Sequence, residues 1–101
     1  MYNRVNANTN KIESVSLKDY TSSNVYTFPY DGYITVSSEQ NTSGHIRLKL
    51  LDPKGRILGY KYMNITNGYQ CESIYVKKGM TFYVYEANVS KDYFVYFNPI
   101  L

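Results

Sequence analysis

The most informative part of this 101-residue sequence is HIRLKLLDPKGR, residues 45–56. Apolar residues at positions 46, 48 and 50 alternate with His, Arg and Lys at positions 45, 47 and 49. Such alternation is typical of a β-strand with one buried face and one solvent-facing face. The following Asp52-Pro53-Lys54-Gly55 has the residue types of a type I turn, with Asp first, Pro second and Gly fourth. We therefore predict a β-hairpin that joins a strand over 45–51 to a strand over 56–63.

The same alternation recurs on both sides of this hairpin, in short segments separated by Gly, Pro, Asn and Asp, without helical periodicity. About eight short strands at this spacing predict an all-β fold, an antiparallel β-sandwich of jelly-roll type. Besides the hairpin, the predicted strands cover 11–18, 24–28, 32–38, 71–76, 80–87 and 93–98, with polar loops at 39–44 and 64–69. The predicted core residues are Val15, Ile34, Val36, Leu48, Ile74 and Val84.

Length and composition indicate one folded domain. A chain of about 100 residues can bury one core, and no Gly/Ser-rich linker divides it. The single cysteine excludes a disulfide within the chain. We assign residues 1–10 to a polar, Asn-rich N-terminal arm and residues 11–101 to a single β-sandwich domain. The arm lacks the apolar stretch of a secretory signal, so we do not expect export by that route.

The last predicted strand departs from the alternation, because it is apolar on both faces. Tyr93, Val95 and Phe97 share one face, and Phe94 and Tyr96 share the other. A strand of this kind is covered on both sides. The cover is either a neighbouring subunit or this chain's own arm and loops. We favour the subunit and predict that these five residues form the contact of a homotrimer.

The sequence offers few residues for catalysis or metal binding. The single histidine, His45, has no carboxylate near it in sequence to orient it, so we interpret it as an exposed strand residue. Cys71 lies beside Glu72, which disfavours a thiolate, so we interpret it as a half-buried thiol. One His and one Cys cannot make a tetrahedral zinc site, and no Gly-rich phosphate loop is present. We therefore expect no enzyme activity, no cofactor and no metal.

The charge pattern bears on the possible partners. The net charge is +3, and the basic residues are scattered, with Lys54, Arg56 and Lys61 as the densest group and Lys77-Lys78 further on. Nucleic-acid-binding domains concentrate Lys and Arg on one face. The apolar runs are far shorter than the roughly 20 residues that span a bilayer. We therefore expect neither a nucleic-acid nor a membrane partner. The 13 tyrosines, without tryptophan, indicate a β-rich binding or assembly protein, since tyrosine favours strands and interfaces.

Three blocks carry a resemblance to a known group of proteins. FPYDGYITV, residues 28–36, places a Pro-x-Asp-Gly-Tyr turn before a core strand, and LLDPKGR, residues 50–56, forms a central hairpin turn. IYVKKGMTF, residues 74–82, has a Val-Lys-Lys-Gly hairpin with Met80 where a polar residue is usual. These blocks resemble the small β-sandwich domains of phage fibres and virion decoration proteins, most closely the head-fibre trimer proteins of crAss-like gut phages. Complement- and tumour-necrosis-factor-type trimers share a similar Pro-x-Asp-Gly-Tyr entry. The resemblance implies a trimeric virion protein without catalytic residues.

Together, these features predict a non-enzymatic virion structural protein, a trimeric head-fibre or capsid-decoration component on the capsid surface that also aids adhesion to a host surface glycan. A chain that begins at Met1 with a polar arm fits a separately encoded assembly protein. We expect the arm to bind another virion protein through Met1, Tyr2, Arg4 and Val5, because aromatic and guanidinium groups are enriched at interfaces. The alternative is a carbohydrate- or surface-binding module of a bacterium, which would use tyrosine platforms on sugar rings.

Overall fold

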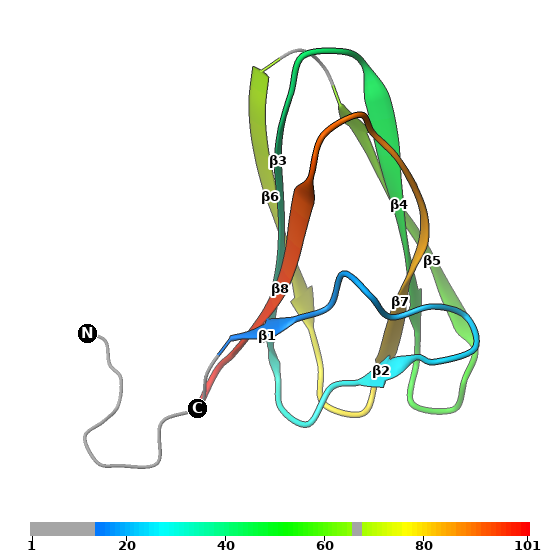
Figure 1. Cartoon of the computed structure of the whole chain (residues 1–101). Coiled ribbons are helices and arrows are strands. Elements are labelled where there is room, and N and C mark those ends of the chain that lie inside the picture. Colours follow the sequence, from blue (N-terminus) through cyan, green and yellow to red (C-terminus); the bar gives the residue numbers. More distant parts are fainter. Residues whose placement is uncertain (1–13, 66–67) are drawn as a thin grey trace.

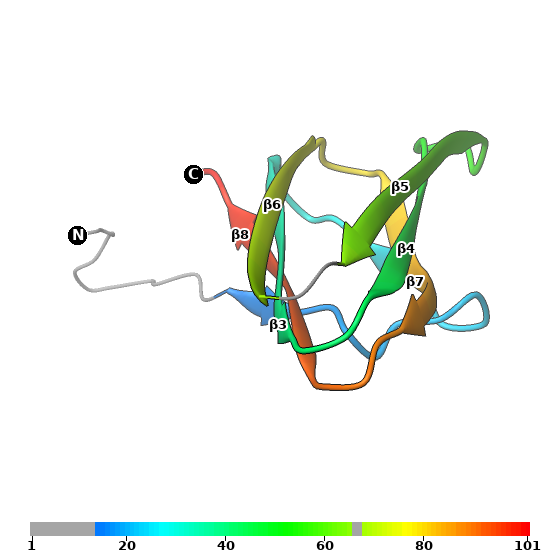
Figure 2. The same ribbon diagram turned by 90° about the horizontal axis from the view of Figure 1, so that it is seen from above.

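The computed structural model describes residues 14–65 and 68–101. In these ranges, eight strands form two antiparallel four-stranded sheets that pack face to face (Figures 1 and 2). The first sheet has the order β1-β8-β3-β6, with β1 at Val15–Ser16, β8 at Tyr93–Pro99, β3 at Gly32–Gln40 and β6 at Gly68–Val76. The second has the order β2-β7-β4-β5, with β2 at Tyr26–Thr27, β7 at Thr81–Asn88, β4 at Gly44–Leu51 and β5 at Ile57–Ile65. The predicted all-β antiparallel sandwich is confirmed. No helix in the described ranges is long and apolar enough to cross a membrane.

The central hairpin forms as its turn residues predict. Strands β4 and β5 pair antiparallel, and the Gly55 N–H donates to the Asp52 carbonyl oxygen at 2.9 Å. Gly55 has a φ of 82°, a left-handed conformation that glycine adopts without steric cost. The inward-facing Ile46 and Leu48 are fully buried, and the outward-facing positions of β4 carry the charged side chains.

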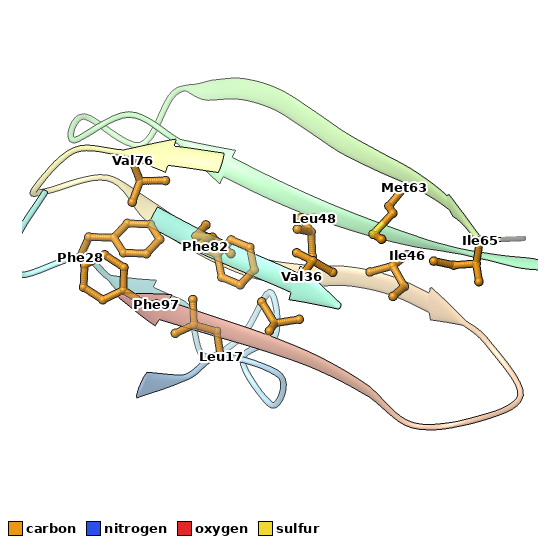
Figure 3. Packing of buried hydrophobic residues seen from close by; sticks show 12 residues of the cluster. Leu17, Phe28, Val36, Ile46, Leu48, Met63, Ile65, Val76, Phe82 and Phe97 are labelled. Atoms are coloured by element: carbon orange, nitrogen blue, oxygen red, sulfur yellow. The ribbon is translucent and has the colours of Figure 1, made fainter. Parts of the chain in front are cut away.

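The core lies between the two sheets and contains the apolar side chains that alternation places inward (Figure 3). Of the predicted core, Ile34, Val36 and Leu48 are fully buried, whereas Val15, Ile74 and Val84 are partly buried and pack against it. Outside those six residues, the fully buried side chains include Ile46 and Val76, which alternation also places inward, and Leu17, Phe28, Met63, Ile65, Phe82, Val95 and Phe97. The Phe28 ring centroid lies 4.9 Å from that of Phe97 and 6.2 Å from that of Phe82, so aromatic contacts join the two sheets.

Both predicted polar loops are too long, because strands occupy half of residues 39–44 and four of the residues in 64–69. Strand β3 continues to Gln40 and β4 begins at Gly44, while β5 continues to Ile65 and β6 begins at Gly68. Glu39 and Gln40 pair with Tyr69 and Gly68 across the sheet, and this pairing extends β3 and β6 beyond the apolar positions. In the opposite direction, the predicted strands 11–18 and 24–28 shrink to the two-residue strands β1 and β2, and residues 11–13 lie outside the described ranges.

The turn predicted at Lys77-Lys78-Gly79 forms, but it is not the hairpin that the resemblance implies. Strand β6 belongs to the first sheet and β7 to the second, so this turn carries the chain from one layer to the other. Two backbone hydrogen bonds join this crossover turn to residues 28–31. The Gly79 N–H donates to the Phe28 carbonyl oxygen at 2.9 Å, and the Phe28 N–H donates to the Met80 carbonyl oxygen at 2.9 Å. Local turn residues cannot distinguish a hairpin from a crossover, because both reverse the chain direction.

Candidate functional site

The outer face of the first sheet exposes aromatic side chains where a solvated sheet face usually carries polar ones. On β8, Phe94 is 46% exposed and Tyr96 is 37% exposed. These two residues are two positions apart, so both point away from the core. Their ring centroids are 6.3 Å apart and their planes differ by 9°, so the rings form a parallel apolar strip.

A second aromatic pair lies on the same face at the neighbouring strands. Tyr33 of β3 and Tyr75 of β6 are directly opposite in register, with ring centroids 5.4 Å apart in an edge-on arrangement. Thr35 is opposite Tyr96 across β3 and β8, so Tyr33 and Tyr96 are diagonal neighbours. We call the surface formed by Tyr33, Tyr75, Phe94 and Tyr96 the aromatic face.

Neutral polar groups lie among these rings. The Ser14 hydroxyl donates to Asn98 Oδ1 at 2.6 Å, and Asn98 Nδ2 donates to Thr35 Oγ1 at 3.1 Å. Together with Tyr96, these three residues line a shallow depression of about 460 Å³. A shallow surface with aromatic rings and a directional row of hydroxyl and amide groups can bind a protein surface or a sugar.

The structure divides the five predicted interface residues between two environments. Val95 and Phe97 are fully buried in this chain's own core, so neither is accessible to another subunit. Tyr93 is partly buried against the same core, and burial raises the pKa of its hydroxyl. Of the five, only Phe94 and Tyr96 are exposed. The sequence showed that the strand is apolar on both sides, but did not show which side the core would take.

The N-terminal arm residues named above, Met1, Tyr2, Arg4 and Val5, lie outside the described residues.

The outer face of the second sheet has a different chemistry, because charged groups dominate it. His45 Nε2 lies 3.0 Å from Glu86 Oε1, and Arg47 Nε lies 3.4 Å from the same oxygen. Lys49 Nζ lies 5.7 Å from the ring centroid of Tyr83 and 5.6 Å from that of Tyr85, within cation–π range. The outward side chains of β4 and β7 thus interact with one another across the sheet through ion pairs and cation–π contacts.

Two interpretations of single residues need correction. His45 is half-buried and has a carboxylate beside it, because β7 brings Glu86 alongside β4 in the sheet. The sequence does not reveal this partner. Alternation places Glu86 on the outward side of its strand, but it does not indicate which strand pairs with that strand. Cys71 is exposed rather than half-buried, because it lies on the outward side of the edge strand β6. Within residues 14–65 and 68–101, no group of three or more His, Cys, Asp or Glu residues is arranged to hold a metal ion.

Comparisons with protein-family models, curated proteins and solved structures found no match to this chain, so its proposed function rests on its own residues and on the resemblance of its turn and strand blocks.

Proposed function

We propose that this protein is a non-enzymatic structural component of a virion, a head-fibre or capsid-decoration protein that assembles as a homotrimer through its aromatic face. The observation that carries the proposal is the exposure of four large aromatic side chains on adjacent strands of one sheet, each between 37% and 47% exposed. Contiguous exposed apolar surface of this kind marks an interaction site.

The energetics favour a subunit contact at this face. Full burial of one large apolar side chain contributes about 1.5–3 kcal/mol, so covering four half-exposed rings in each subunit offsets part of the free-energy cost of association. Tyrosine and phenylalanine are also among the residues enriched at interface centres. In a cyclic trimer, each subunit places this face against a neighbour. A rotation of about 120° between subunits then closes the ring, so no interface is left unpaired.

The strand order supports a jelly-roll assignment. The first strand pairs with the eighth, the second with the seventh, the third with the sixth and the fourth with the fifth. A long hairpin folded over into two sheets has this pairing, and it is the winding of a jelly roll, a fold frequent in viral capsid proteins. The virion placement itself rests on the resemblance of residues 28–36, 50–56 and 74–82 to phage fibre and decoration domains. The N-terminal arm would then bind the capsid or another fibre protein.

Light scattering coupled to size exclusion tests the assembly. We expect a mass of three times the 11.8 kDa chain for the wild type at micromolar concentration. The double variant Phe94→Ser with Tyr96→Ser should be a folded monomer. The matched control is Tyr85→Ser, which removes a ring that is 50% exposed on the opposite sheet and should leave the trimer intact. A monomeric wild type would refute the trimer, and a trimeric double variant would refute this face as its contact.

A second function, recognition of a neutral carbohydrate, is favoured by one specific observation. The depression beside Tyr96 combines an aromatic ring with the Ser14–Asn98–Thr35 row of hydrogen-bonding groups, an arrangement suited to a sugar ring and its hydroxyls. Calorimetric titration with neutral oligosaccharides distinguishes the two functions. Binding that is lost in Thr35→Val while the mass is unchanged would favour the carbohydrate site.

A further inference from the structure

We propose that one end of the sandwich is a docking surface for anionic lipid membranes. Three turns meet at this end, which is the lower end in Figure 1: residues 28–31, the hairpin turn 52–56 and the crossover turn 77–79. We call this surface the basic end; its membrane-facing residues are Lys54, Arg56, Ile57, Leu58, Lys77 and Lys78. This inference is independent of the trimer and of the virion placement.

The apolar part of the basic end is a pair of consecutive aliphatic residues. Ile57 is 58% exposed and Leu58 is 57% exposed, immediately after the hairpin turn. Tyr30, 42% exposed, lies in the adjoining turn. Aliphatic side chains held at the tip of a domain gain free energy when they enter the boundary between lipid headgroups and acyl chains, and tyrosine is enriched at that depth.

The charged part consists of cations that face solvent. Lys54, Lys77 and Lys78 are exposed, and the Arg56 side chain is 73% exposed. The cations on the basic end therefore complement a negatively charged surface.

Two acidic side chains at this end, Asp31 and Asp52, are engaged by the turns themselves. Asp52 is 9% exposed and accepts from the backbone N–H groups of Lys54 and Arg56, both at 2.9 Å. Asp31 accepts from the backbone N–H of Lys78 at 2.8 Å. Asp52 Oδ2 also accepts from Arg56 Nε at 2.5 Å, so the Arg56 guanidinium is paired with this carboxylate. The side chains of Lys54, Lys77 and Lys78 are exposed, and these three lysines supply most of the positive charge that faces outward.

The three turns are tied to one another, so the basic end is already in place before it meets a partner. The Gly79 N–H donates to the Phe28 carbonyl at 2.9 Å, and Lys78 bonds to Asp31. A Cβ at Gly79 would lie 3.4 Å from the Pro53 ring, so the crossover turn packs against the hairpin turn. A pre-organised surface loses little conformational entropy on binding.

The combination of side chains favours a lipid surface over a soluble polyanion. Nucleic acids and acidic polysaccharides are bound by cations with polar or aromatic partners, and exposed aliphatic residues contribute little there. At a membrane, the same cations meet lipid phosphates while the aliphatic pair enters the interface. The sequence-based expectation of no membrane partner rested on the absence of a spanning segment, and peripheral docking does not require one.

Vesicle co-sedimentation of the full chain tests the proposal. We expect binding to phosphatidylcholine vesicles that contain phosphatidylglycerol, much weaker binding to phosphatidylcholine alone, and weakening as salt is raised. Each lysine near an anionic surface contributes enough that Lys77→Ala with Lys78→Ala should weaken binding about tenfold or more. Ile57→Ser with Leu58→Ser should weaken it by a similar factor.

Matched controls lie at the opposite end of the sandwich. Lys91→Ala removes an exposed cation and Tyr69→Ser removes a ring that is 68% exposed, and both variants should bind vesicles as the wild type does. Thermal unfolding and the solution mass of every variant separate loss of docking from loss of folding or assembly. Absence of wild-type binding at low salt would overturn the proposal. Binding that depends on the lysines but not on Ile57 and Leu58 would show a purely electrostatic surface and would also overturn it.

Discussion

Two buried polar side chains on the inner side of β3 differ in whether they have partners. Gln40 is 2% exposed, and its amide donates to the backbone oxygens of Lys91 at 3.0 Å and Asp92 at 3.2 Å. Its Oε1 accepts from the Lys91 N–H at 2.8 Å, so this side chain fastens the end of β3 to the β7–β8 connection. Ser38 is also 2% exposed, yet its hydroxyl has no hydrogen-bond partner. Since an unpaired buried hydroxyl costs free energy and a bonded amide does not, the two residues should respond oppositely to substitution.

We predict that Gln40→Leu lowers the free energy of unfolding by about 2 kcal/mol, because several bonds to the connection are lost. Ser38→Ala should leave stability unchanged or raise it slightly, since the deleted hydroxyl has no partner. Chemical denaturation of both variants beside the wild type measures the difference. Equal destabilisation by the two substitutions would contradict this account of the hydrogen bonds.

We also predict that Asp52 contributes to the loss of stability in acid. The Arg56 backbone N–H lowers the pKa of Asp52 below its ordinary value of 3.8, with further lowering by the Arg56 side chain and the Lys54 N–H. A carboxyl whose pKa is lowered on folding stabilises the protein above the unfolded-state pKa, and this contribution is lost as the pH falls through the folded-state pKa. Asp52→Asn should therefore be less stable than the wild type at neutral pH. As the pH is lowered below 3.8, the thermal unfolding midpoint of this variant should decrease by less than that of the wild type. Glu39→Gln, which removes the same charge from an exposed strand position, is the control, and identical acid profiles for Asp52→Asn and the wild type would contradict the prediction.

The four edge strands of the two sheets differ in length. Strands β1 and β2 are two-residue edges, whereas the other two edges, β5 and β6, have nine residues each. A long edge strand exposes a row of backbone groups to which another chain can pair. Glu72 lies in the middle of β6, opposite the buried Val36 and therefore on the inward side, and it is half-buried. An inward-pointing charge at an edge disfavours the addition of a further strand, because that strand would cover the charge.

We predict that Glu72→Val folds with the same secondary structure but associates at lower protein concentration than the wild type. The reason is that an apolar side chain removes the charge that opposes edge-to-edge pairing. Light scattering against concentration measures the effect. Ser73→Val, which adds an apolar residue on the outward side of the same strand, is the control, and equal association of both variants would show that added hydrophobicity alone is responsible.

The molecule as a whole presents two unlike outer faces and one basic end on a single core. The aromatic face is neutral over its centre, whereas the second sheet binds its own charges through Glu86 and the tyrosines beside Lys49. This division is consistent with one sheet meeting other subunits and the other facing solvent. Within residues 14–65 and 68–101, the core and the side chains packed against it begin at Val15 and join both sheets, which is the basis for expecting that the fold does not need the arm.

We therefore predict that deletion of residues 1–10 leaves the thermal midpoint nearly unchanged and abolishes incorporation into particles. Calorimetry measures the first effect, and occupancy on assembled particles measures the second. A loss of stability of 1 kcal/mol shifts the midpoint of a domain of this size by about 4–8 °C, so a larger fall would show that the arm belongs to the folded domain. Full occupancy by the truncated protein would contradict the anchoring role.

The all-β class, the central hairpin and part of the core were predictable from the sequence. Alternation of apolar and polar residues reports which side of a strand is buried, and the Asp-Pro-Lys-Gly turn specifies its own geometry, because both signals act between residues close in the chain. Phe94 and Tyr96 were found in the same way, as the second face of a strand that is apolar on both sides.

Only the tertiary structure decided which strands became neighbours and which layer each one joined. The pairing of β6 with β3, rather than with β7, turned the Lys77–Gly79 turn from a hairpin into a crossover. The same long-range pairing buried Gln40, brought Glu86 beside His45, and placed Val95 and Phe97 inward and Phe94 and Tyr96 outward. The long-range pairing also brought Lys54 to the same end of the sandwich as Lys77 and Lys78, although Lys54 is more than 20 residues from them in the sequence. None of these outcomes has a local signal, because strand partners are selected by burial and hydrogen bonding across the whole domain.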